Sequence, residues 1–170
     1  MTIHLVRHAE PKVVPSVDSR HWRLSEAGRM AATGLGPRLP RDAVWVSSTE
    51  PKAHETLRCA ADPDIAVALD AGFDEVHREE AFDPDFRARR LAWVEGRLDE
   101  RHEGWETPAE VAVRFERAVG VHTARGDALV VGSHGMALTA WLVHARGVVS
   151  PHDAGRFWQA LAFPDVIDVP

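Results

Sequence analysis

The chain has 170 residues, of which 45% are hydrophobic, and its formal net charge at pH 7 is −6. This length predicts one domain over residues 1–170 with a sizeable core. The acidic balance argues against a surface for nucleic acid or an anionic membrane, so an anion site must be a local cluster of basic side chains. The single cysteine, Cys59, allows no intrachain disulfide, and no signal or membrane-spanning segment is found, so we expect a cytoplasmic protein.

The first predicted element is an apolar strand over residues 2–6 that leads directly into Arg7 and His8. Turn residues at 9–11 follow it, and strands that end in this way deliver side chains to the carboxyl edge of an α/β sheet, where ligands bind. Arg7 offers a planar fork for phosphate or carboxylate, and His8 offers a base or nucleophile near neutral pH. Taken alone the pair is weak evidence, because a histidine at a strand end is more often only hydrogen-bonded.

Residues 12–22 contain Pro15 and few apolar repeats, so they are predicted to form a surface loop beside this strand end. Ser25 then caps a predicted helix that ends near residues 34–37. A second strand-to-loop junction comes next: residues 43–47 alternate as a strand, and a helix is expected from Glu50 or Pro51 to about residue 61.

The middle of the chain is rich in turns and charges. A short strand is predicted over residues 65–69, and a helix from residue 83 or 84 towards residue 100. The helix carries three arginines that could meet a distal acidic group, although a solvated face is the favoured interpretation; they are Arg87, Arg89 and Arg90. Thr107 and Glu110 form a capping box that opens the next helix, with Pro108 in its first turn.

The last part repeats the pattern of the first. A β-branched run from Ala128 ends in Ser133-His134-Gly135, and a helical pattern follows from Met136 to about residue 146. If this strand is parallel to the first, His8 and His134 emerge at the same sheet edge, where the amides that open the helix favour an anion. A short helix capped by Ser150 and a terminal strand over residues 166–169 complete the chain. Alternating strands and helices predict a three-layer α/β/α sandwich with a mostly parallel central sheet and possibly an antiparallel edge.

The two motifs, Leu5-Val6-Arg7-His8-Ala9-Glu10 and Ser133-His134-Gly135, resemble those of the histidine phosphatase superfamily, also called phosphoglycerate mutase-like. The resemblance covers nearly the whole chain in order. It implies a phosphoglycerate mutase-like fold, a nucleophilic His8, and Arg7 and His134 around the phosphate. Lys52 stands where the family usually has a phosphate-holding arginine, and it keeps the charge but loses the bidentate fork. Glu106 and Arg114 also match family positions and are interpreted as structural.

The resemblance also implies a general acid, and Glu75 matches it best. The usual continuation of that family segment is absent here, so three neighbouring carboxylates remain alternatives: Asp74, Glu79 and Glu80. The carboxylate would protonate the departing alcohol and then activate water against the phosphohistidine.

The function implied is that of a histidine acid phosphatase-like enzyme, a phosphomonoester hydrolase with no metal and no other cofactor. Its expected partner is a small phosphorylated substrate or a phosphoprotein, without nucleic acid or membrane. A metal enzyme is disfavoured because neither a H-E-x-x-H motif nor a Cys-His cluster is present. Two alternatives remain: a phosphoglycerate mutase-type phosphotransferase, and a catalytically decayed module that binds phosphorylated ligands. The resemblance associates a mutase with an extra inserted segment and a long C-terminal tail that enclose the phosphoenzyme, whereas here only about fifty residues separate Glu75 from the strand that begins at Ala128. This short span, the absence of an asparagine near Val14 and Lys52 in place of the arginine favour the phosphatase over the mutase.

Overall fold

A computed structural model describes residues 1–170, and its centre is a five-stranded sheet with the strand order β3-β2-β4-β1-β5. Neighbouring strands are parallel except that β5 runs antiparallel to β1 at one edge. The strands are β1 (Thr2–Arg7), β2 (Val44–Ser47), β3 (Val67–Leu69), β4 (Ala128–Ser133) and β5 (Asp165–Val169). The predicted α/β class, with its mostly parallel sheet and antiparallel edge, is confirmed.

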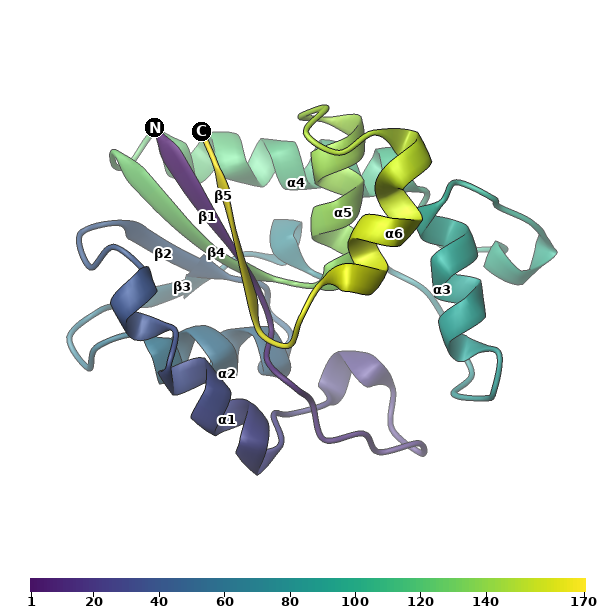
Figure 1. Cartoon of the computed structure of the whole chain (residues 1–170), viewed down its shortest axis with the longest axis horizontal. Helices are drawn as coiled ribbons and strands as arrows, with labels where there is room; N and C mark the ends of the chain where they lie inside the picture. Colours follow the sequence, from purple (N-terminus) through teal and green to yellow (C-terminus); the bar gives the residue numbers. More distant parts are fainter.

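Helices cover both faces of the sheet. Figure 1 shows α1 and α2 on one side and α4 and α5 on the other, with α3 and α6 beyond α5. The helices are α1 (Glu26–Thr33), α2 (Pro51–Ala60), α3 (Phe86–Val94), α4 (Pro108–Thr123), α5 (Gly135–His144) and α6 (Ala154–Ala160). No helix combines the length and the hydrophobicity that a membrane crossing requires.

Alternating strand residues build a core on each face. In β1, Leu5 belongs to the larger core of 25 buried residues, whereas Val6 belongs to a second core of 7. In β4, Val131 belongs to the larger core and Val130 to the second core. Because successive strand side chains point to opposite faces, a strand covered by helices on both sides must be apolar at consecutive positions. This is why the strands read as unbroken apolar runs.

The predicted caps form, because each offers an oxygen to an otherwise unpaired amide at a helix start. The Oγ of Ser25 accepts from the Gly28 amide at 2.9 Å, and Thr107 and Glu110 make the reciprocal capping box of α4. Ser150 caps a single 3-10 turn over Pro151–Asp153, and the α-helix begins only at Ala154.

The helix predicted to run towards residue 100 ends much earlier. The last helical residue of α3 is Val94, and Gly96 adopts a positive φ of 70°. The Gly96 amide donates to the Trp93 carbonyl and the Arg97 amide to the Ala92 carbonyl, both at 2.9 Å. This is the Schellman arrangement, which glycine permits because it lacks the Cβ that disfavours left-handed backbone.

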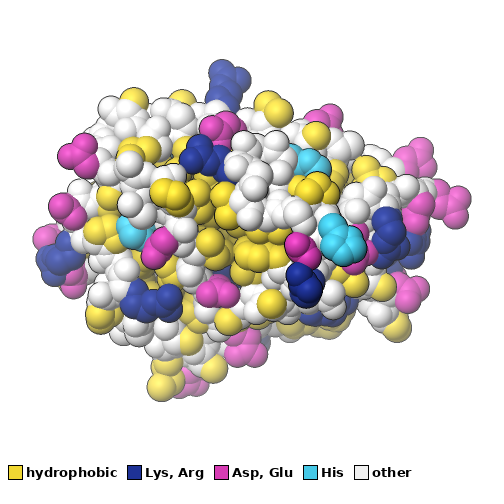
Figure 2. Space-filling view, turned by 45° about the horizontal axis from the view of Figure 1, so that its top comes forward, with side chains coloured by type: hydrophobic (Ala, Val, Ile, Leu, Met, Phe, Trp, Pro, Cys, Tyr) yellow, Lys and Arg dark blue, Asp and Glu magenta, His cyan; other side chains and the backbone are white.

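The surface is mixed in character. On the face shown in Figure 2, charged side chains surround a central area where hydrophobic side chains gather. Positive and negative groups are interspersed on this face, as the modest net charge of −6 leads one to expect.

Candidate active site

Three parallel strands end side by side and place a polar residue at each end. Arg7 pairs with Ser133 across β1 and β4, and the amide of His8 donates to the Ser133 carbonyl at 3.0 Å. On the other side of β4, the Ser48 amide donates to the Gly132 carbonyl at 2.8 Å. The prediction that His8 and His134 emerge at one sheet edge is confirmed: their ring centroids lie 5.2 Å apart.

The imidazole of His8 has a defined tautomer. Its Nδ1 donates to the Ala9 carbonyl at 2.8 Å, and a carbonyl oxygen can only accept. In the neutral ring the proton therefore sits on Nδ1 and leaves a lone pair on Nε2. Burial lowers the pKa of His8 well below its usual value, and the neighbouring His134 and Lys52 lower it further. His8 is thus neutral at pH 7, with a nitrogen free to attack.

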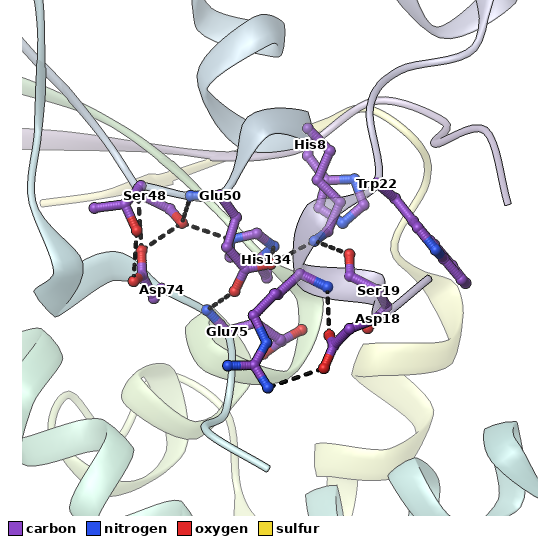
Figure 3. A network of polar contacts seen from close by, with 12 residues as sticks. His8, Asp18, Ser19, Trp22, Ser48, Glu50, Asp74, Glu75 and His134 are labelled. Atoms are coloured by element: carbon purple, nitrogen blue, oxygen red, sulfur yellow. Dashed lines mark hydrogen bonds and ion pairs between the residues drawn. The ribbon is translucent and has the colours of Figure 1, made fainter. Parts of the chain in front are cut away.

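His134 is oriented by a hydrogen-bonded chain that begins at Asp74. The Oγ of Ser48 donates to Asp74 Oδ1 at 2.7 Å, so it accepts from His134 Nε2 at 2.8 Å (Figure 3). His134 Nε2 therefore carries a proton, whereas its buried Nδ1 has no hydrogen-bond partner. That nitrogen lies 3.9 Å from Glu50 Oε2. Burial lowers the pKa of His134 well below its usual value, and Lys52 lowers it further, so in the free protein the ring is neutral and Nδ1 carries a lone pair. A bound phosphate dianion would favour a proton on Nδ1, and this N–H could then donate to a phosphoryl oxygen.

Arg7 reaches the same place as an arginine without an acidic partner. Its Nη1 donates to the Leu161 carbonyl at 2.5 Å, and its guanidinium lies 3.6 Å from the centre of the Phe163 ring. Its buried Nε has no hydrogen-bond partner. Burial lowers the pKa of Arg7 to about 10, so the group stays charged at pH 7. Gly135 allows this approach, because a Cβ there would lie 3.2 Å from Nε.

Lys52 also lines the site, but it is already paired. Its Nζ donates to the Ser19 carbonyl at 2.8 Å and forms an ion pair with Glu50. Burial lowers the pKa of Lys52, and the contact with Glu50 opposes that shift. An incoming phosphate must therefore compete with Glu50 for this ammonium group.

Glu75 lies in the site as an ionised carboxylate. Its oxygens accept from the amides of Val76 at 3.1 Å and Ala137 at 2.9 Å, so it sits at the N-terminus of α5. Burial raises the pKa of Glu75, but the interactions with His134, Arg78 and Arg90 outweigh burial, and the net shift is downward. The positive end of the helix favours the ionised form as well.

The segment around Glu75 is held from two sides. The Glu75 amide donates to Glu50 Oε1 at 2.9 Å, and the Glu75 carbonyl accepts from Arg114 Nη2 at 3.0 Å. Arg114 is itself fixed by Glu106, whose carboxylate lies 2.9 Å from its Nε. The structural interpretation of Glu106 and Arg114 is therefore confirmed, and together they position the backbone of the candidate acid.

The three alternative acids lie elsewhere. Asp74 accepts from Ser48 Oγ and from both the amide and the hydroxyl of Thr49, each at 2.7 Å. Glu80 is paired with arginines, and Glu79 is exposed. Of the four carboxylates, Glu75 is the one that lines the cleft containing His8.

This cleft has a volume of about 380 Å³, and arginines from α3 take part in its wall. The expectation that they form only a solvated face is wrong for two of them, because Arg87 and Arg90 line the cleft. Arg90 donates to Glu80 at 2.8 Å, whereas Arg89 pairs with Asp83 away from it. The α3 helix starts beside the cleft, so Arg87 in its first turn lines the cleft, although the charge pattern of the helix is typical of a solvent-exposed face.

Sequence reasoning missed Glu50. Its carboxylate pairs with Lys52, accepts from the Glu75 amide and lies 3.9 Å from His134 Nδ1. Glu50 therefore connects three of the predicted site residues. Its position in the sequence could have indicated this role, because Glu50 follows the end of β2, at the same edge of the sheet as the two histidines.

Solved structures share this fold. A mycobacterial glucosyl-3-phosphoglycerate phosphatase in complex with VO3 has a TM-score of 0.75 and 18% identity, with 99% of this chain and 92% of that chain covered. Bacillus stearothermophilus YhfR has a TM-score of 0.75 and 20% identity, covering 99% and 90%. A phosphoserine phosphatase from Entamoeba histolytica, in complex with phosphoserine, has a TM-score of 0.72 and 16% identity, covering 98% and 89%. At these identities the likeness establishes the fold alone.

A comparison with curated protein sequences found no match. The family model described as histidine phosphatase superfamily (branch 1) matches residues 3–162, which include both histidine motifs, Lys52 and Glu75. This match spans almost the whole chain, and the fold agrees with it. The chain therefore belongs to the histidine phosphatase superfamily, branch 1.

Proposed function

We propose that this protein is a phosphomonoester hydrolase that forms a phosphohistidine on His8. The observation that carries the proposal is the pairing of His8, which lines the cleft, with the buried His134 beside it, with His8 Nε2 free of a proton. Phosphoryl transfer needs a nucleophile, positive charge around the equatorial oxygens and a proton for the leaving oxygen. Arg7 and Lys52 supply the positive charge, His134 joins them if the bound phosphate draws a proton onto its Nδ1, and Glu75 supplies the proton for the leaving oxygen. Similar structures include two named phosphatases, which agrees with this reaction class.

In the first step, His8 Nε2 forms a bond to phosphorus while the ester P–O bond breaks. The leaving oxygen takes a proton from Glu75, which must be protonated when the reaction starts. Binding of a phosphate dianion favours this protonation, because a negative charge close to the Glu75 carboxylate raises its pKa. The products of this step are the free alcohol, the phosphohistidine and the Glu75 carboxylate.

In the second step, the Glu75 carboxylate takes a proton from water as the water oxygen attacks phosphorus. The P–N bond breaks, and its electron pair returns to His8 Nε2. Inorganic phosphate leaves, and Glu75 is protonated again for the next cycle. One carboxylate thus serves as acid and then as base, as microscopic reversibility allows.

Hydrolysis is favoured over phosphate transfer to a second substrate because a mutase must keep water from the phosphoenzyme. Here the cleft is bordered by well-exposed side chains: Phe82 is 43% exposed and Phe163 42%. Lys52, which shares its charge with Glu50, holds a phosphoryl group less firmly than an unpaired arginine.

The test of this proposal supplies 3-phosphoglycerate with a bisphosphoglycerate primer and follows both 2-phosphoglycerate and free phosphate. We expect phosphate release to be faster than isomerisation. Faster isomerisation would make the protein a phosphotransferase of the mutase type. Binding of phosphorylated ligands without turnover of any ester in a broad panel, phosphoproteins included, would favour the decayed binding module.

Lys52 provides a matched comparison within the chain, because the only other lysine, Lys12, is exposed and lies outside the cleft. We expect Lys52→Gln to lower kcat/KM for phosphomonoesters at least about tenfold, since it removes a positive charge from the phosphate site and leaves Glu50 unpaired. Lys12→Gln should have no such effect. Steady-state kinetics of both variants checks this, and equal values of kcat/KM for the two would exclude Lys52 from phosphate binding.

A further inference from the structure

Three aromatic rings form a cluster on the wall of the His8 cleft. The ring centroids of Trp22 and Phe82 are 5.6 Å apart, and those of Phe82 and Phe86 are 4.9 Å apart. Trp22 comes from the segment after β1, whereas the two phenylalanines come from the start of α3 and the residues before it. The Trp22 indole donates to the carbonyls of Val14 and Val17, so the polar edge of the ring is satisfied within its own loop. What the cluster offers to the cleft is apolar surface.

A second apolar surface begins at the nucleophile itself. The ring of Phe163 lies 5.3 Å from the ring of His8, and Trp158 lines the same cleft. Phe82 and Phe163 are the two aromatic side chains of this chain that are well exposed, and both lie here. Aromatic side chains are normally buried, so two exposed rings beside a candidate active site indicate a binding surface.

The polar residues of the cleft point to the same kind of ligand. Its lining contains no Asp, Asn, Gln or Thr, and Ser19 is its only hydroxyl. The other polar side chains of the lining are charged, and Arg78 and Arg90 already pair with Glu80, so few free neutral groups remain for the hydroxyls of a sugar or another polyol. The arginines beyond the phosphate site lie over rings: Arg90 is 3.7 Å from the Phe86 centroid and Arg87 is 5.1 Å from that of Trp158. Flat guanidinium and aromatic faces suit a planar, apolar ligand.

We propose that this cleft binds the alcohol part of the substrate as an apolar, ring-bearing group, held by Trp22, Phe82 and Phe86 while the phosphate lies at His8. The proposal rests on the proposed hydrolase activity for its substrate, and it adds the chemical class of the leaving alcohol. A cleft of about 380 Å³ has room for a phosphate and one aromatic ring on a short linker.

Binding of two phosphonates, which cannot be hydrolysed, tests the subsite independently of catalysis. Calorimetry should show 3-phenylpropylphosphonate binding to the wild-type protein at least about tenfold more tightly than 3-hydroxypropylphosphonate, because only the first buries a ring. Phe82→Ala should lower this ratio several-fold, and Phe82→Leu should restore part of it. Leu98→Ala is the control, since Leu98 is 44% exposed against 43% for Phe82 but lies outside the cleft. A ratio near one in the wild type, or an unchanged ratio in Phe82→Ala, would overturn the proposal.

The matching phosphate esters separate this proposal from the proposed function. Both esters release a primary alcohol, so the chemical step has similar demands and kcat/KM reports recognition. The ring-bearing ester should again be preferred by about tenfold or more. Failure to hydrolyse either ester would contradict the hydrolase activity, whereas the phosphonate ratio would still decide the subsite.

Discussion

Replacing His8 with alanine is expected to reduce kcat for any phosphomonoester substrate by at least about 10³-fold, because the variant has no group that can form the phosphoenzyme. The free Nε2 of His8, set by the bond from Nδ1 to the Ala9 carbonyl at 2.8 Å, is the basis for this expectation. Steady-state assays of purified wild-type and variant protein measure the effect. Ordinary turnover by His8→Ala would show that another group is the nucleophile.

A control separates chemistry from folding in that experiment. His4 lies in the same strand, and its Nδ1 contacts Asp168 Oδ1 at 2.7 Å outside the cleft. The variant His4→Ala should keep its turnover, because that contact joins β1 to the outer strand β5 and neither residue lines the cleft. Circular dichroism of both variants checks that the fold persists.

Replacing Glu75 with glutamine is expected to lower kcat/KM about 10²-fold or more for alkyl phosphates, and much less for aryl phosphates. An alkoxide leaving group needs a proton from the enzyme, whereas a phenoxide leaves readily without one. Glutamine keeps an oxygen that can accept from the Ala137 amide, which now bonds Glu75 Oε1 at 2.9 Å, so the local fold should survive. The measurement compares kcat/KM for one alkyl and one aryl ester, because kcat/KM reports the steps up to phosphoenzyme formation, whereas hydrolysis of the phosphoenzyme is common to both esters.

Glu79→Gln is the matched control, because Glu79 is exposed and does not line the cleft. This variant should behave as wild type on both esters. If Glu75→Gln lowered kcat/KM equally for the two esters, the proton donor would have to be sought elsewhere. Because water activation also needs the carboxylate, a burst of alcohol from aryl esters in Glu75→Gln would support the second role as well.

The histidine pair could be predicted because its position follows from simple rules. Apolar runs ending at His8 and His134 are read directly from the sequence, and parallel pairing of β1 with β4 then brings both to one edge. The helix starts were equally readable, since Ser25 and Thr107 are side chains that cap a nearby amide. Local chemistry and one topological rule therefore account for the fold and for the centre of the site.

The remainder depends on contacts between distant segments, which local patterns do not encode. Glu50 reaches both Lys52 and the Glu75 amide, 25 residues away, and only the packing of α2 against the sheet edge brings them together. The aromatic cluster likewise joins Trp22 to Phe82 and Phe86. Gly96 was a local signal that could have shortened α3, but the helical charge pattern continued past it.

The most direct test of the account is to trap the covalent intermediate. Wild-type protein mixed with a ³²P-labelled phosphomonoester and quenched within milliseconds should carry label that is stable in alkali and lost in acid, as expected for a phosphoramidate bond. Peptide mapping under alkaline conditions should place this label on His8, and His8→Ala should carry none. Turnover of the same ester with no label on His8 at any quench time would contradict the account.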